Sequence, residues 1–322
     1  MINLTRLNNI MSLQYVNVIF TIKIEHQIKF LTYPVFIFRS VIGKELHLMA
    51  CLFRNRTCEE CPLKFTCPYS FLFETHVLKD NDIIKGRNKA SHPFVLSSSA
   101  KYGEIRDNLD LNVTLFGKGI KYLPYFYYAI KRAGEKGIFK ERVKYSILDA
   151  KVNNKSIIKN PNMIDTDIER NKWQFNNNDS TDFKKRFFIT LLSPLRLKSK
   201  GIYKKDLNFK DILIAAERRA EILLGLYGSE NSENNEEIST LRSLSLNCLT
   251  ETEKADLLWH DLPYYSSRQR LNLKMGGVSG SLEVTAIVNE SILSLLKGAE
   301  IFHIGKNSIF GLGKIRIENI KV

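Results

Sequence analysis

The sequence predicts an α+β protein made of two consecutive units with the same order of strands and helices. Residues 12–152 alternate between the period-two pattern of strands and the helical pattern of about 3.6 residues. A polar stretch at 153–184 interrupts this pattern, with a hairpin predicted around Asn153 and Asn154, and the pattern restarts at residue 186. Hydrophobic residues make up 44% of the 322 residues, which is enough for a packed core in each unit.

The first unit begins with a strand and an amphipathic helix. β-branched and aromatic side chains such as Val16 and Phe20 mark the strand, whereas Ile42, Leu46 and Met49 recur at helical spacing. The predicted elements are a strand at 12–23, a helix at 38–53, a strand at 109–116, a helix at 122–133 that stops near Gly134 and Gly137, and a strand at 142–152. The segment between residues 53 and 109 is predicted to be irregular or to contain a further strand.

The second unit repeats this order without clear sequence identity to the first. Asn208 is predicted to cap its long helix, because Asp211 follows at the capping-box spacing, and Gly228 is predicted to end it. The predicted elements are a strand at 186–195, a helix at 208–228, an acidic mobile loop at 229–237, a hairpin at 271–287 broken by Gly276, Gly277 and Gly280, a helix at 291–296 and a strand at 313–320.

These two orders of elements are compatible with tandem ferredoxin-like (RRM-like) domains, in which helices cover one face of an antiparallel sheet. The first domain is predicted at residues 1–153, with a cysteine-rich insertion at about 51–75. Residues 154–184 form the predicted connector, and the second domain is predicted at residues 185–322.

The charge balance favours a polyanionic partner. Lys and Arg total 48 against 34 Asp and Glu, a formal net charge of +14. Cations that contact phosphates release condensed counterions, which favours nucleic acid, although composition alone leaves a solvated basic surface equally open. No stretch has the apolar length of a membrane span, and residues 1–20 lack the features of a signal peptide. A cytoplasmic protein without membrane contact is therefore expected.

Four of the five cysteines, Cys51, Cys58, Cys61 and Cys67, lie within one short segment. In a reducing compartment this cluster indicates metal binding before disulfides, and the two-residue spacing between Cys58 and Cys61 is typical of a tetrahedral thiolate site. A structural zinc is the first prediction. An iron–sulfur cluster, which uses the same ligands, is an alternative, and four reduced thiols without metal are another. Cys248 stands alone and is expected in the core.

A glycine-rich loop precedes the last predicted strand. Glycine lets backbone N–H groups approach a phosphate closely, and lysines in the loop add positive charge. The loop does not resemble a dinucleotide-binding loop, because such a loop follows the first strand and begins a helix. It does not resemble a Walker loop either, because that motif requires Gly-Lys-Ser/Thr. On glycine content alone a structural turn is the alternative. The residues predicted to hold a phosphate backbone here are Gly305, Lys306, Gly311, Gly313 and Lys314.

The position of this loop after the last helix resembles the C-terminal signature of the RAMP superfamily of CRISPR proteins. Motifs along nearly the whole chain resemble its Cas-six (Cas6) family, the endoribonucleases that process precursor crRNA, in a branch with a four-cysteine insertion. The matching stretches are Arg39 with Gly43 and Leu46, residues 92–96, 115–117, 122–126 and 192–197, Trp259 with Asp261, and residues 265–269 and 275–280. Ser40 departs from the pattern, since glycine is expected after Arg39.

This resemblance implies an endoribonuclease that binds CRISPR repeat RNA and cuts precursor crRNA once per repeat. In such enzymes the ribose 2′-OH attacks the adjacent phosphate, which gives a 2′,3′-cyclic phosphate and a 5′-OH, and the cleavage requires no cofactor. The product would pass to subunits of a CRISPR effector complex. RAMP proteins also serve as non-catalytic subunits that bind crRNA in such a complex, and this is the alternative function.

Metal-free RNA cleavage needs a group that titrates near neutral pH, and the chain has six histidines. His47 is the first candidate, because Arg39 and Gly43 precede it at helical spacing on one face of the first helix. His303, at the entry to the glycine loop, is the second, and Tyr33 is a candidate helper. An ordinary packing or surface role is the alternative for each. Candidate RNA contacts outside the loop are Arg39, Lys44, Arg268, Arg270 and Lys274.

Overall fold

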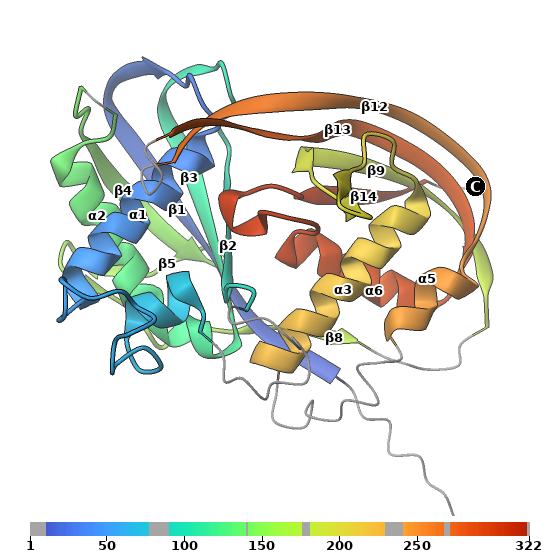
Figure 1. The fold of residues 1–322 in the computed structure, drawn as a ribbon, viewed down its shortest axis with the longest axis horizontal. Coiled ribbons are helices and arrows are strands. Elements are labelled where there is room, and N and C mark those ends of the chain that lie inside the picture. Colours follow the sequence, from blue (N-terminus) through green and yellow to red (C-terminus); the bar gives the residue numbers. More distant parts are fainter. Residues whose placement is uncertain are drawn as a thin grey trace, which may run out of the picture.

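The computed structural model places two α+β domains side by side (Figure 1). It describes residues 11–76, 90–139, 141–175, 181–228, 241–266 and 271–320. The predicted mobile loop at 229–237 lies outside these residues, as do Arg268 and Arg270. Within the described residues, the helices are too short or too polar to cross a membrane.

The N-terminal domain is an antiparallel sheet with two helices packed on it (Figure 1). Its elements are β1 (Met11–Lys29), α1 (Pro34–Ala50), β2 (Phe94–Ser98), β3 (Ile105–Phe116), α2 (Leu123–Lys136) and β4 (Tyr145–Val152). The strand order is β2-β3-β1-β4, and β1 buries alternate residues such as Val16, Val18 and Phe20 completely. The βαββαβ order confirms the predicted ferredoxin-like fold.

The segment at 154–184 adds strands to this first sheet. β5 (Lys155–Ser156) pairs with β4 across Asn153 and Asn154, whose φ angles of 47° and 64° place both in the left-handed region favoured by a tight hairpin turn. β6 (Ile158–Asn160) and β7 (Met163–Ile164) form a small separate hairpin. β8 (Asn171–Phe175) pairs with the start of β1.

The C-terminal domain repeats the same topology. Its main elements are β9 (Phe183–Leu195), α3 (Phe209–Tyr227), β12 (Leu249–Ser266), β13 (Leu271–Val288), α6 (Glu290–Phe302) and β14 (Ile315–Ile320), with strand order β12-β13-β9-β14. The predicted capping box is present, because the Asn208 side chain accepts from the Asp211 N–H and the Asp211 carboxylate accepts from the Asn208 N–H. Short elements complete the domain: β10 (Lys198–Ser199), β11 (Ile202–Tyr203) and α5 (Leu244–Asn247).

The predicted hairpin at 271–287 is wrong, because these residues form the single strand β13, whose hairpin partner is β12. The glycines that suggested a turn serve close packing instead. A Cβ on Gly276 would lie 2.5 Å from the Trp259 ring, and one on Gly277 would lie 2.9 Å from Pro194. Gly280 has a φ of +125° at a register shift in the pairing with β9, where a side chain would strain the strand.

The β12–β13 hairpin extends from the second domain over the first (Figure 1). Near its far end, Leu262 and Met275 are buried in the hydrophobic core of the N-terminal domain. The Tyr264 ring lies 5.3 Å from the ring of Phe36 on α1 and 5.4 Å from that of Phe310. The hairpin therefore contributes side chains to the core of the other domain.

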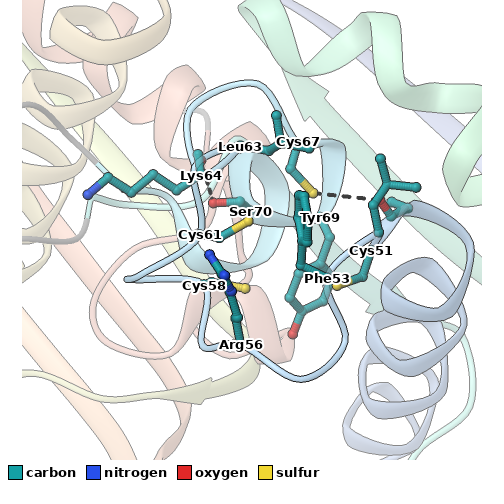
Figure 2. A pocket seen from close by; sticks show the side chains of 12 residues that line it. Cys51, Phe53, Arg56, Cys58, Cys61, Leu63, Lys64, Cys67, Tyr69 and Ser70 are labelled. Atoms are coloured by element: carbon teal, nitrogen blue, oxygen red, sulfur yellow. Dashed lines mark hydrogen bonds between the residues drawn. The ribbon is translucent and has the colours of Figure 1, made fainter.

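The cysteine-rich segment follows α1 as a series of turns and ends in a π-helix, η1 (Ser70–Glu74). The side chains of Cys51, Cys58, Cys61 and Cys67 all line one pocket (Figure 2). Tyr69 lines the same pocket from the start of η1. The insertion therefore lies against the C-terminal end of α1.

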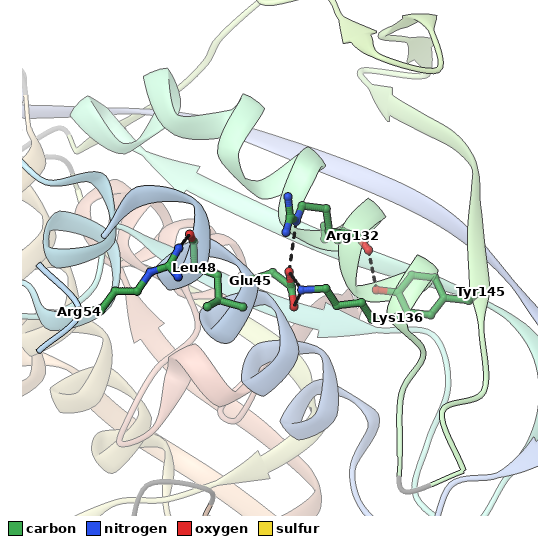
Figure 3. A network of polar contacts seen from close by, with 7 residues as sticks. Glu45, Leu48, Arg54, Arg132, Lys136 and Tyr145 are labelled. Carbon is green, nitrogen blue, oxygen red and sulfur yellow. Dashed lines mark hydrogen bonds and ion pairs between the residues drawn. The ribbon is translucent and has the colours of Figure 1, made fainter. Parts of the chain in front are cut away.

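A buried carboxylate holds α1 against α2 (Figure 3). Glu45 is 2% exposed, and its Oε2 lies 3.2 Å from Nε of Arg132 and 2.7 Å from Nζ of Lys136, both on α2. A carboxylate at this depth needs such partners, because an unpaired buried charge is strongly unfavourable. The Tyr145 hydroxyl of β4 donates to the Ile130 carbonyl of α2 at 2.8 Å. These contacts fix the position of the helix that carries His47.

Candidate functional site

The glycine loop lies in the junction between the two domains. It connects α6 to β14 through the short helix η6 (Ser308–Phe310). Gly305, Gly311 and Gly313 have φ angles of +80°, +78° and +74°, so each adopts a conformation that favours glycine. A Cβ on Gly311 would lie 2.9 Å from Val35 of α1, which shows how closely the loop packs on the first domain.

Several amides of the loop already have acceptors within the protein. The Lys306 N–H donates to the Arg196 carbonyl at 2.9 Å, and the Gly313 N–H donates to the Pro194 carbonyl at 3.0 Å. The Lys314 N–H donates to the Ser193 hydroxyl at 2.9 Å. These N–H groups join the loop to the end of β9. They are therefore not available to a phosphate, which differs from the prediction that they would bind one.

The lysines of the loop have different surroundings. Lys306 is exposed at the apex, where its side chain is accessible to a ligand. The Lys314 ammonium donates to the hydroxyl of Ser97 on β2 at 3.0 Å, which joins the two domains. Burial lowers the pKa of Lys314, and the nearby Arg316 lowers it further. Lys306 is therefore the more accessible of the two lysines, and its predicted contact with a phosphate stays a prediction.

A basic and aromatic cluster beside the apex was missed by the sequence reading. The Arg196 guanidinium lies over the Tyr203 ring at 4.4 Å, and the Tyr203 ring lies 6.3 Å from that of Trp259 on β12. Lys198 is exposed and lies over the same tyrosine ring at 5.7 Å. Rings next to cations are the groups that bind single-stranded nucleic acid by stacking and charge. The alternation of Arg196 and Lys198 before Tyr203 was the available signal.

One face of α1 carries Arg39, Gly43 and His47, as predicted, and η1 covers it. The Arg39 guanidinium lies 4.1 Å from the centre of the Phe310 ring and 5.5 Å from that of Phe73. Burial lowers the pKa of Arg39. A Cβ on Gly43 would lie 2.9 Å from the Phe73 ring, so glycine at this position lets η1 pack onto the helix. Arg39 thus links α1 to the glycine loop within an aromatic cluster.

His47 is half-buried one turn before the end of α1. Its ring packs edge-on against Tyr69, with ring centroids 4.6 Å apart and an interplanar angle of 74°. The eight-residue separation from Arg39 corresponds to about 12 Å along the helix axis. Lys44 is exposed on the same helix. His47 therefore combines partial exposure with a ring that packs on Tyr69.

Tyr33 lies at the N-cap of α1 and is 8% exposed. Burial raises the pKa of its hydroxyl to about 12, against the effect of a hydrogen bond with Ser193. The hydroxyl also donates to the Gly311 carbonyl at 3.5 Å. This environment keeps Tyr33 protonated and favours a role in joining α1 to the glycine loop.

His303 ends α6 and is 3% exposed, with a φ of +52°. Burial lowers the pKa of His303 well below its usual value, and the charges of Lys314 and Arg219 lower it further. Arg219 is itself buried and donates from Nε to the Phe302 carbonyl at 3.1 Å. The imidazole is therefore neutral and far from solvent, which favours a structural role for it.

The low pKa of His303 predicts a pH-dependent stability. The unfolded chain binds a proton on this residue below about pH 6.5 and the folded chain does not, so stability falls as pH falls, by at most about 1.4 kcal/mol per pH unit. His303→Asn keeps a residue suited to positive φ and removes the titration. Urea unfolding at about pH 7 and about pH 5 should show a smaller loss for the variant than for wild type. An exposed-site control, His26→Asn, should behave as wild type, and an equal loss in all three proteins would contradict this assignment.

Lys274 is exposed on β13, opposite Pro263 of β12. Arg268 and Arg270, which were predicted to share its face, lie outside the described residues. The basic strip predicted along this hairpin therefore stays a prediction.

Comparison with known proteins gives matches over both domains. Residues 189–315 match the family model described as CRISPR-associated endoribonuclease Cas6, and residues 13–171 match a model described as an N-terminal domain. A protein of Archaeoglobus fulgidus, described as uncharacterized, is 22% identical over 88% of this chain and 90% of its own length.

Two solved structures share the fold. A Cas6 product complex superimposes with a TM-score of 0.55 at 14% identity, over 95% of this chain and 99% of that one. A structure of Thermus thermophilus Cas6 gives a TM-score of 0.50, also at 14% identity and over the same shares. At 14% identity, this likeness shows that the fold of both ferredoxin-like domains is shared.

Proposed function

We propose that this chain is a Cas6-type protein, an endoribonuclease that cleaves precursor crRNA within its repeats. The observation that carries the proposal is the match of residues 189–315 to the Cas6 family, in a chain whose two domains share the layout of a solved Cas6 product complex. The formal net charge of +14 supports a nucleic-acid substrate.

The proposed substrate contacts lie on the second domain. Lys306, at the apex of the glycine loop, would bind a phosphate of the backbone, and the exposed Lys198 would bind another. Trp259 and Tyr203 would stack on unpaired bases. Arg39 and Tyr33 would act indirectly, by holding the glycine loop against α1.

The proposed reaction is attack of a ribose 2′-OH on the adjacent phosphorus. The new 2′-O–P bond replaces the bond to the 5′ oxygen, which gives a 2′,3′-cyclic phosphate and a 5′-OH. One proton leaves the 2′ oxygen and one reaches the 5′ oxygen, so a side chain that exchanges protons near neutral pH accelerates the step. His47 is the proposed group, since its ring is partly exposed and held by Tyr69, whereas the ring of His303 is buried. In this proposed step no metal ion or cofactor contacts the phosphate or transfers a proton.

The second candidate function is a non-catalytic RAMP subunit that binds crRNA in an effector complex. The burial of Tyr33 and His303 favours it, because it leaves His47 as the single accessible group among the three proposed catalytic residues. In either function the RNA and subunits of a CRISPR effector complex are the proposed partners.

Cleavage in EDTA separates these functions. The purified full chain is incubated with CRISPR repeat RNA in buffer containing EDTA, and with the same RNA carrying a single 2′-deoxy nucleotide at the cut position. We expect one cut per repeat, a cyclic phosphate terminus, and no cut in the deoxy substrate, because the nucleophile is missing. Binding of the repeat without any cut would support the non-catalytic subunit. Cleavage of the deoxy substrate would contradict the proposed chemistry.

A further inference from the structure

The four clustered cysteines surround one small cavity. Cys51, Cys58, Cys61 and Cys67 line one cavity of ≈ 20 Å³, which is room for a single particle the size of a water molecule (Figure 2). Arg56 and Lys64 also line it. Four thiolates around a divalent ion leave a net negative charge, which these cations would offset.

The cysteines come from three separate parts of the segment. Cys51 caps α1 and donates its N–H to the His47 carbonyl at 2.9 Å, and Cys67 leads into η1, where its carbonyl accepts from Phe71 at 2.9 Å. Cys58 and Cys61 lie in the turns between them. A common ligand for these side chains would therefore join the end of α1 to the start of η1.

The turns that carry Cys58 and Cys61 have little apolar packing of their own. Leu52 is 78% exposed and Phe65 is 50% exposed, and all four thiols are free rather than paired in disulfides. Within the described residues, no three metal-binding side chains are yet placed at ligand distances, so the sulfurs must move inward around an ion, to about 2.3 Å from zinc. Exposed turns can make that movement at low cost, and small metal-bound segments gain their order from the metal itself.

We propose that Cys51, Cys58, Cys61 and Cys67 together bind a thiophilic metal, Zn²⁺ in the first place, and that this metal fixes Tyr69 against His47. Tyr69 lines the cysteine cavity and its ring also packs on His47, so one side chain connects the two sites. Tyr69 stacks in turn on Phe73, with ring centroids 5.6 Å apart. Tyr69 is a positioning residue in this proposal, and its effect on cleavage rests on the proposed function.

Metal content tests the first part without reference to RNA. Full-length wild type, Cys58→Ser, Cys61→Ser and the control Cys248→Ser are purified and their metals measured by mass spectrometry. Cys248 belongs to the other domain and does not line the cavity. We expect one zinc per chain in wild type and in Cys248→Ser, and loss of most of it in the other two. An iron–sulfur cluster would instead give iron, acid-labile sulfide and visible colour with the same dependence on these cysteines. Wild type that takes up neither zinc nor iron and sulfide under reducing conditions overturns the site, as does full metal content in both Cys58→Ser and Cys61→Ser.

Variants of Tyr69 test the second part in metal-loaded protein. Tyr69→Leu removes the ring contact with His47, and Tyr69→Phe keeps it. Both should retain the metal and bind repeat RNA, but Tyr69→Leu should cleave about 10-fold more slowly or worse, because small displacements of a catalytic group are costly. Normal cleavage by metal-loaded Tyr69→Leu overturns the link to His47. If wild type binds the metal but does not cleave repeat RNA, the proposed function fails and the metal site stands.

Discussion

Replacing His47 by alanine is expected to slow single-turnover cleavage of repeat RNA by about 100-fold or more, the range in which positioned acids and bases contribute. The imidazole lies on α1, whose position is fixed by the pairing of Glu45 with Arg132 and Lys136. Because the His47 ring is half-buried and packs on Tyr69 at the surface of α1, its loss should leave repeat binding nearly unchanged. The measurements are the cleavage rate at saturating enzyme and the dissociation constant for a non-cleavable 2′-deoxy repeat.

His26→Ala is the matched control, because this histidine is exposed on β1 and has no place in the proposed site. It should cleave at the wild-type rate. Thermal unfolding of both variants separates loss of chemistry from loss of fold. Cleavage by His47→Ala at the wild-type rate would remove His47 from the mechanism.

Gly313→Ala is expected to destabilise the protein by about 3 kcal/mol or more, since it combines a strained backbone conformation with a steric clash. The φ of +74° disfavours a side chain, and the added Cβ would lie 1.8 Å from the Ile304 carbonyl oxygen. Relief would require Gly313 to move away from Ile304, which would break the bond from the Ile304 N–H to the Gly313 carbonyl and disturb the bonds from Gly313 to Pro194 and from Lys314 to Ser193. Urea unfolding measures the difference in free energy.

Gly103→Ala isolates the steric part of this effect. Gly103 has a similar φ of +84°, but a Cβ there would meet no atom within 4 Å. The control should lose only about 1 kcal/mol, the cost of the backbone conformation alone. Equal losses in the two variants would mean that the loop yields to the added methyl group.

Much of the fold could be predicted because its signals are local. The capping box of Asn208 and Asp211 lies within one helical turn, and the alternation in β1 is visible because one face of that strand is buried. β12 gave no such signal. Its residues 249–256 are all exposed, and the buried Leu262 packs into the core of the other domain, so no apolar face repeats along the strand.

The sequence predicted which residues of α1 share a face, but it did not predict the residues that surround the glycine loop and His303. The helical spacing of Arg39, Gly43 and His47 placed them on one face, as the structure has them. The hydrogen-bond acceptors of the glycine loop could not be predicted from neighbouring residues. Those acceptors belong to Ser193, Pro194 and Arg196, which precede the loop by more than a hundred residues. The burial of His303 depends on Arg219 and Lys314 in the same long-range way.

The two cores also contain residues from each other's domain. Leu262, Met275 and Leu312 belong to the core of the first domain, whereas Leu13 and Phe116 belong to that of the second. Neither half can therefore complete its interior alone, and the chain should unfold in one cooperative transition rather than domain by domain. The proposed substrate contacts lie on one domain and the proposed catalytic histidine lies on the other. This shared packing therefore fixes the distance between the RNA contacts and the catalytic group.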